Sequence, residues 1–132
     1  LVRAYKSSKN SVLIGTMAFW EGIDLPGDEL SILMMLRIPF SNPNEPYMRY
    51  LNDQISSLGE NSFNKLQVPA ACLKMKQGFG RLIRTEYDSG IFIITDPRIN
   101  NSRYGHKILN SFPIESEPYY HFSTILNNKK IL

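Results

Sequence analysis

Cysteine is almost absent from this sequence, since Cys72 is the single one among 132 residues. One thiol cannot form an intramolecular disulfide, and it cannot supply the thiolate cluster that a zinc or iron–sulfur centre needs. The two histidines, His106 and His121, lack the spacing of paired metal ligands, so we predict no metal site. So little cysteine is typical of a reducing compartment, and we expect a cytoplasmic location.

Long hydrophobic runs and an excess of one charge are lacking too. The longest unbroken apolar run, residues 32–36, is far too short to cross a membrane, so we expect no membrane partner. Fifteen lysines and arginines against 12 acids leave a net charge of +3, which permits a nucleic-acid partner without arguing for one. The sequence has no signal-peptide pattern and no initiator methionine. We expect it to be a piece cut from a longer protein.

Three short apolar runs predict β-strands at residues 12–16, 31–38 and 90–96. Each run is nearly continuous rather than alternating, which is the pattern of strands buried on both faces of a parallel sheet. Three strands make a small sheet for this class. We therefore expect the first strand–helix units of the domain to lie upstream of this sequence.

Helix patterns alternate with these runs, at residues 1–6, 47–58, 69–85 and 102–111. Strands alternating with helices predict an α/β fold in which helices flank a parallel sheet. The length fits one domain, which we place at residues 1–132. Residues 112–132, rich in proline and aromatics, are expected to form a closing loop and tail.

Two glycine-containing segments begin like phosphate-binding loops and then depart from the pattern. Residues 22–27 open like the P-loop of nucleotide hydrolases, but Asp28 and Glu29 stand where that loop needs Lys and Ser or Thr. Two carboxylates there would repel phosphates. Residues 78–80 open like a dinucleotide fingerprint, but Ile83 stands at the third glycine position. The chain therefore does not encode a complete nucleotide-hydrolysing machine.

The segment 77–84, Gln-Gly-Phe-Gly-Arg-Leu-Ile-Arg, carries the strongest chemical signal. On a continuous helix, Gln77, Arg81 and Arg84 fall within roughly 60° of one another, at about 100° per residue. Two neighbouring arginines with no acid between them repel unless they meet an anion. Guanidinium groups bind phosphate oxygens bidentately, so this face is suited to a phosphate.

Two glycines in the same segment favour the close approach of a ligand or another backbone to this helix. Gly78 and Gly80 each cost about 1 kcal/mol inside a helix, which is reasonable if a ligand or another backbone must come near. The alternative is a solvated basic helix face, with Glu86 and Asp88 as charge partners. Spacing alone leaves both interpretations open.

A second candidate segment, residues 15–27, follows the first predicted strand, where α/β proteins place ligand loops. Thr16 offers a neutral hydrogen-bond donor to a phosphate. Two large aromatics and two acids follow it: Phe19, Trp20, Glu21 and Asp24. The aromatics could stack on a base, and the acids could accept bonds from ribose hydroxyls or orient arginines. Alternatively, the aromatics close the core and the acids cap the next turn.

Together these segments resemble motifs of the superfamily 2 helicases of the DinG/XPD type. Residues 14–27 resemble motif V, residues 77–84 resemble motif VI, and residues 37–46 resemble the loop after the middle strand. The form Phe-Trp-Glu-Gly-Ile-Asp is closer to bacterial DinG than to XPD. The resemblance covers roughly residues 12–113. It implies a RecA-like C-terminal helicase domain, the second motor of an ATP-dependent DNA helicase connected with DNA repair.

The resemblance also implies how the site is shared. In this family ATP lies between two RecA-like domains, and the first supplies the Walker A loop and the Mg²⁺ site. We therefore expect ATP with Mg²⁺ to be bound mainly by that first motor domain of the same chain. The present residues alone should bind no ATP with useful affinity and should be inactive. The second partner implied by the family is single-stranded DNA.

Roles carry over residue by residue from the resemblance. Arg84 would be the arginine finger on the γ-phosphate, with Arg81 beside it as the second catalytic residue. The ATP-binding side would hold Gln77, Glu21, Gly22 and Asp24. The residues facing single-stranded DNA, or coupling the two sites, would be Thr16, Phe19 and Trp20.

Two other functions stay open at this point. The same fold could serve as a nucleic-acid-binding or regulatory module without motor activity, although keeping both Arg81 and Arg84 favours the motor. An unrelated α/β phosphate-binding domain would bind a mononucleotide by itself. Two copies of the isolated fragment could also pair through an exposed sheet edge, as an artefact.

Overall fold

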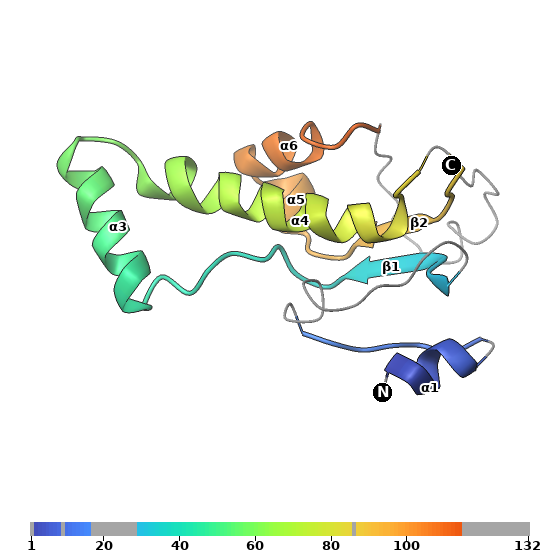
Figure 1. Ribbon diagram of the computed structural model, residues 1–132. Coiled ribbons are helices and arrows are strands. Elements are labelled where there is room, and N and C mark those ends of the chain that lie inside the picture. The colour runs from blue at the N-terminus through green and yellow to red at the C-terminus, as the bar shows by residue number, and fades with distance from the viewer. Residues whose placement is uncertain (1, 9, 17–28, 86, 115–132) are drawn as a thin grey trace.

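A computed structural model describes residues 2–8, 10–16, 29–85 and 87–114. Along the chain, the elements in this part are α1 (Val2–Ser7), β1 (Ile32–Met35), α3 (Pro46–Ser57), η2 (Phe63–Gln67), α4 (Val68–Leu82), β2 (Ile91–Ile94), α5 (Arg98–Asn101) and α6 (Arg103–Leu109) (Figure 1). None of these helices is both long and apolar enough to cross a membrane.

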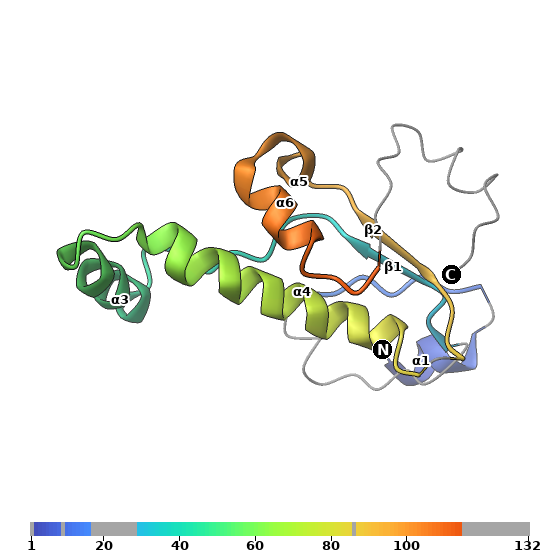
Figure 2. The ribbon, with the colours of Figure 1, turned by 90° about the horizontal axis from the view of Figure 1, so that it is seen from above.

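The two described strands form a parallel pair. Ile32 lies opposite Ile91 and Met35 lies opposite Ile94, so the carboxyl ends of β1 and β2 share one edge. Helix α4 packs against both strands, and α6 packs against α4 (Figures 1 and 2). The prediction of an α/β fold with a parallel sheet flanked by helices is confirmed.

The strand predicted at residues 12–16 is wrong. This segment is neither strand nor helix, and Val12 and Ile14 are 86% and 85% exposed. An apolar run becomes a strand only when its backbone finds a partner. Within the described residues, β1 and β2 pair with each other and not with this segment.

The helices predicted at residues 1–6, 47–58 and 102–111 are confirmed as α1, α3 and α6. Each end lies within two residues of the prediction. Helix α3 starts at Pro46, because proline lacks an N–H that the first helical turn does not need. Helix α6 starts after Ser102, whose hydroxyl accepts a hydrogen bond from the Gly105 N–H at 3.0 Å. Local capping therefore sets these boundaries.

Helix α4 begins differently from the prediction, because a π-turn, η2, leads into it. Pro69 lacks an N–H, and its ring crowds the carbonyl of Lys65 four residues earlier. The turn before it is widened, so that the Val68 N–H donates to the Phe63 carbonyl five residues back. Phe63 and Gln67, the first and last residues of η2, are held in place by this widened turn.

The hydrophobic core lies between α4, the chain after β1, and the α5–α6 corner. Its buried members are Met35, Ile38, Val68, Ala71, Met75, Ile99 and Ile108. Two groups of three aromatic rings flank it, one made of Phe40, Phe63 and Tyr104, the other of Phe79, Phe92 and Phe112. The first group joins the loop after β1 to η2 and α6.

A buried carboxylate joins the ends of the two strands. Asp96 follows β2, and its side chain is 3% exposed. Its oxygens accept the Ile38 N–H at 2.9 Å and the Arg98 N–H at 3.0 Å. The Arg98 guanidinium also donates to it, with Nη2 at 2.6 Å. The guanidinium above all, and then the two backbone N–H groups, hold the Asp96 pKa well below its ordinary value of 3.8.

We expect Asp96→Asn to lower the free energy of unfolding at neutral pH by roughly 2–4 kcal/mol, because hydrogen bonds to a charged, buried acceptor are lost. Since the folded pKa is depressed, the stabilisation is full above the ordinary pKa of 3.8 and is lost as the pH falls through the folded value. Urea unfolding followed by circular dichroism at several pH values measures both effects.

The matched control is Glu60→Gln, because Glu60 pairs with Lys65 at 3.1 Å on the surface. Such exposed pairs contribute about 0–1 kcal/mol. The wild type and Glu60→Gln should therefore lose stability alike on acidification, and Asp96→Asn should lose less. If the free energy of unfolding falls equally on acidification in the wild type and in Asp96→Asn, this carboxylate is not the source of the acid sensitivity.

Candidate functional site

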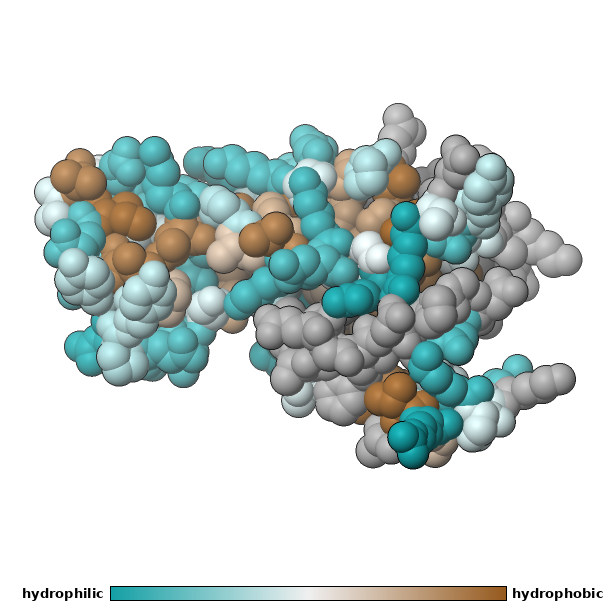
Figure 3. All heavy atoms as spheres, viewed as in Figure 1, coloured by the Kyte–Doolittle hydropathy of each residue, from teal (hydrophilic) through white to brown (hydrophobic). Residues whose placement is uncertain are grey.

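The outward face of α4 carries two of the predicted site residues. Gln77 is exposed and Arg81 is half-buried, and a spacing of four residues places them about 40° apart around the helix. The opposite face, with Met75 and Phe79, is buried in the core. Hydrophilic side chains gather over the C-terminal half of α4 in Figure 3. The structure thus brings the amide and one guanidinium to the same outward face.

Gly80 lies on this face and is not required by the packing of the domain. A Cβ atom built on Gly80 would meet no atom within 4 Å, leaving out the helix backbone itself. Gly78, two residues earlier, is buried instead. Of the two glycines, only Gly80 therefore leaves open space beside Arg81.

The predicted helix reaches too far at its C-terminal end, and this changes the position of Arg84. Helix α4 ends at Leu82, and Ile83 has extended backbone angles (φ −118°, ψ 107°). Arg84 is exposed and lies beyond the helix, so its predicted place on the helical face of Gln77 and Arg81 is wrong. Close packing fixes this end, because a Cβ on Gly90 would lie 2.5 Å from Leu82 Cδ1.

A carboxylate holds the backbone around Arg84. The N–H groups of Arg84 and Thr85 both donate to Asp88 Oδ2, each at 2.8 Å. These two backbone hydrogen bonds are the main reason why the Asp88 pKa lies below its ordinary value. The alternative interpretation named Asp88 as a charge partner of the arginines, and a smaller electrostatic interaction with Arg84 also lowers the Asp88 pKa. In addition, Asp88 closes this turn through the two backbone hydrogen bonds. An Asp four residues after an arginine, just before Ser89-Gly90, is a turn signal that could have indicated it.

The position of Arg81 also benefits the helix itself. It is the basic residue in the last turn of α4, where the negative end of the helix dipole favours a cation by about 0.3–1 kcal/mol. That local benefit does not explain a second arginine held just past the helix. Two guanidiniums at one helix end suit a ligand with several anionic oxygens.

Most of the second candidate segment lies outside the described residues, including Phe19, Trp20, Glu21, Gly22 and Asp24. Thr16 is described, and it is exposed in an irregular segment. In the part of the chain that the structure covers, no three His, Cys, Asp or Glu side chains are grouped closely enough to hold a metal ion.

Comparisons with known proteins assign the chain to a family. Residues 1–115 match the family model of the helicase C-terminal domain, so the chain belongs to this family. The RecA-like α/β class expected from the resemblance is thereby confirmed.

Three relatives illustrate the similarity. The chain is 46% identical over 108 residues to the ATP-dependent DNA helicase DinG of Photobacterium profundum. It is 40% identical over 116 residues to the 3'-5' exonuclease DinG of Bacillus subtilis, and 39% identical over 116 residues to the ATP-dependent DNA helicase YoaA of Haemophilus influenzae. These matches cover 82%, 88% and 88% of this chain, but only 16%, 12% and 18% of the relatives.

Proposed function

We propose that the chain is the second motor domain of an ATP-dependent DNA helicase of the DinG type. The observation that carries the proposal is the helix end described above: Gln77 and Arg81 lie on the outward face of α4, and Arg84 follows on a turn closed by Asp88. In this proposal the three side chains face ATP held by the first motor domain of the same polypeptide. Two of the three relatives above are named ATP-dependent DNA helicases, which supports it.

The arginines would act as a switch. The γ-phosphate would offer anionic oxygens to the guanidiniums of Arg81 and Arg84, so ATP would favour the closed arrangement of the two domains. Hydrolysis removes those partners and the domains separate. Arg84 stabilises the charge that develops on the transferred phosphoryl group, and Arg81 and Gln77 position the phosphates.

The other proposed contacts follow from this arrangement. The motif V residues Glu21, Gly22 and Asp24 would face the nucleotide, and Thr16, Phe19 and Trp20 would face single-stranded DNA. Mg²⁺ would be held by the first domain together with the phosphates, where it neutralises charge. The cytoplasmic location stays a prediction.

Hydrolysis of ATP by the intact polypeptide, with and without single-stranded DNA, tests the proposal. We expect hydrolysis that DNA stimulates. The 132-residue chain alone should bind ATP more weakly than about 1 μM, a dissociation constant that corresponds to roughly 8 kcal/mol, because half of the site is missing. Binding of ATP by this chain below that concentration would instead favour a self-contained phosphate-binding domain.

A second function is favoured by one finding. The Bacillus subtilis relative carries the name of an exonuclease rather than a helicase, although it is 40% identical to this chain. The fold could therefore serve as a nucleic-acid-binding or regulatory module without motor activity. An intact polypeptide that binds single-stranded DNA, but whose ATP hydrolysis does not respond to it, would establish this alternative.

A further inference from the structure

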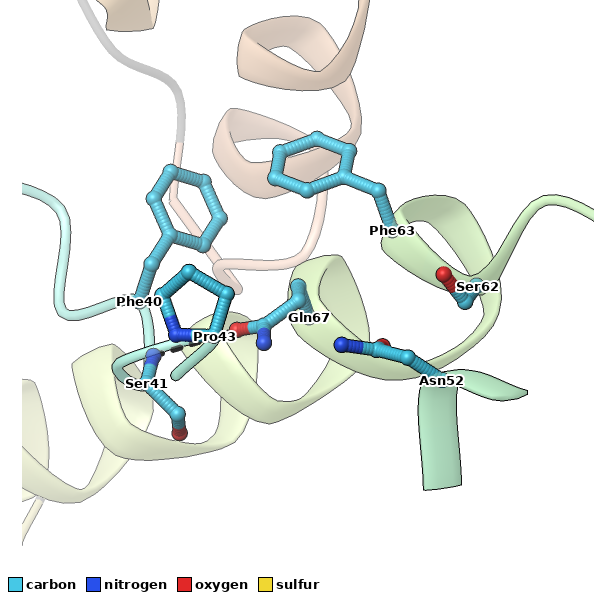
Figure 4. A pocket seen from close by; sticks show the side chains of 7 residues that line it. All are labelled: Phe40, Ser41, Pro43, Asn52, Ser62, Phe63 and Gln67. Atoms are coloured by element: carbon cyan, nitrogen blue, oxygen red, sulfur yellow. Dashed lines mark hydrogen bonds between the residues drawn. The ribbon is translucent and has the colours of Figure 1, made fainter. Parts of the chain in front are cut away.

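A pocket of about 240 Å³ lies at the opposite end of α4 from the arginines. It is formed where the loop after β1, helix α3 and the π-turn η2 meet (Figure 4). Its lining consists of Phe40, Ser41, Pro43, Asn52, Ser62, Phe63 and Gln67. The volume is below the roughly 300–1,000 Å³ of pockets for drug-sized ligands, so a single ring system is the right size of occupant.

The polar side chain at the centre of this pocket is almost completely buried. Gln67 is 5% exposed, and its Oε1 accepts the Ser41 N–H at 3.1 Å. This bond fixes the orientation of the amide, because a backbone N–H requires the oxygen. The Gln67 Nε2 has no hydrogen-bond partner among the described residues and keeps contact with the pocket. The two N–H donors of this amide therefore open onto the pocket, with no acceptor among the described protein residues.

The other walls combine an aromatic surface with a second amide. The rings of Phe40 and Phe63 contact each other with centroids 5.1 Å apart, and both line the pocket. In Figure 4 the Asn52 amide points from α3 toward Gln67, on the same side of the two rings. No hydrogen bond of the Asn52 side chain occurs within the described part of the chain. Donors, an acceptor and apolar ring surface therefore converge.

We propose that this pocket binds a single nucleobase of single-stranded DNA. A base has apolar faces that stack on aromatic rings, and its edge carries donors and acceptors that side-chain amides satisfy. Asn52 supplies one donor–acceptor pair, and Gln67 supplies donors alone. The inference rests on the proposed function, because it assumes that the polypeptide binds DNA.

The surroundings favour a nucleotide over a peptide side chain. Lys74 lies at the pocket rim, with Nζ donating to the Ser41 hydroxyl at 3.2 Å. In the proposal its charge attracts the sugar-linked phosphate of the bound nucleotide. An apolar side chain of a protein partner would satisfy the rings but would leave the N–H groups of the almost completely buried Gln67 amide without a partner, which is costly.

The experiment measures binding of the intact polypeptide to oligothymidylate and to an abasic oligonucleotide of the same length. We expect Asn52→Ala to weaken oligothymidylate binding about three- to tenfold, the range of one lost hydrogen bond and weakened stacking. Binding to the abasic oligonucleotide should not change. The dependence of binding on salt should also stay the same, because Asn52 contacts no phosphate.

Two further variants complete the test: Asn52→Leu is a second change in the pocket, and Gln54→Ala is the control. Asn52→Leu fills the pocket and should weaken oligothymidylate binding more than Asn52→Ala. Gln54→Ala removes an exposed amide from the same helix and should change nothing. If both Asn52 variants bind oligothymidylate as the wild type does, the pocket is not a base site, although the helicase proposal stands. If the wild type binds neither oligonucleotide, both proposals fail.

Discussion

Arg84→Ala in the intact polypeptide is expected to lower DNA-stimulated ATP hydrolysis by about a thousandfold. An arginine that stabilises charge on the transferred phosphoryl group contributes about 10³–10⁵ to kcat. The loss should appear in kcat more than in KM, because the contact strengthens in the transition state. Arg84→Lys should recover only part of the rate, since an ammonium lacks the planar fork that binds two oxygens. Steady-state hydrolysis at saturating DNA measures each rate.

The matched control is Arg103→Ala, which removes an exposed arginine at the start of α6, on another element. Its rate should equal that of the wild type. The thermal midpoints of all variants should be similar, because the substitutions keep the backbone N–H groups of residues 84 and 85 that bind Asp88. A rate for Arg84→Ala within a few fold of the wild type would exclude Arg84 as the arginine finger.

Gly105→Ala is expected to lower the free energy of unfolding by about 3 kcal/mol or more. A Cβ on Gly105 would lie 2.0 Å from the carbonyl oxygen of Ile99, so the α5–α6 corner would have to open. A backbone atom cannot rotate away as a side chain can, which places the cost at the upper end of overpacking effects. The thermal midpoint should fall by about 10 °C. Urea and thermal unfolding of the chain measure both.

The same substitution at another glycine, Gly80→Ala, is not expected to lower the free energy of unfolding. Its Cβ would meet nothing within 4 Å, and alanine exceeds glycine in helix propensity by about 1 kcal/mol. The variant should therefore be as stable as the wild type or up to about 1 kcal/mol more stable. If Gly105→Ala were no less stable than Gly80→Ala, the close contact at the α5–α6 corner would be refuted.

The fold was predictable from the sequence where local pattern and tertiary structure agree. Apolar runs indicated β1 and β2, and helix patterns alternating with the runs indicated α1, α3 and α6. The same reasoning failed at residues 12–16, because an apolar run does not show whether a partner strand is available. It also missed η2, because the widened turn follows from Pro69 acting on a carbonyl four residues earlier.

The candidate site was predictable in its residue types but not in its full geometry. The spacing of Gln77 and Arg81 placed both on one face, and α4 keeps that arrangement. Arg84 was misplaced because the helix end is set by packing of Leu82 near Gly90 and by the Asp88 carboxylate, contacts that local propensity does not contain. The Gln67 amide was not predicted as a site residue, because its burial depends on a loop 26 residues away in sequence.

Helix α4 has a mechanical consequence. Its fifteen residues form a stiff rod about 22 Å long, with Arg81 in its last turn and the pocket proposed for a base beside its first turn. If closure around ATP tilts this rod by about 10°, its far end moves by about 4 Å, which is close to the rise between stacked bases. Under the two proposals together, a lever of this length would convert one hydrolysis event into a displacement of one nucleotide.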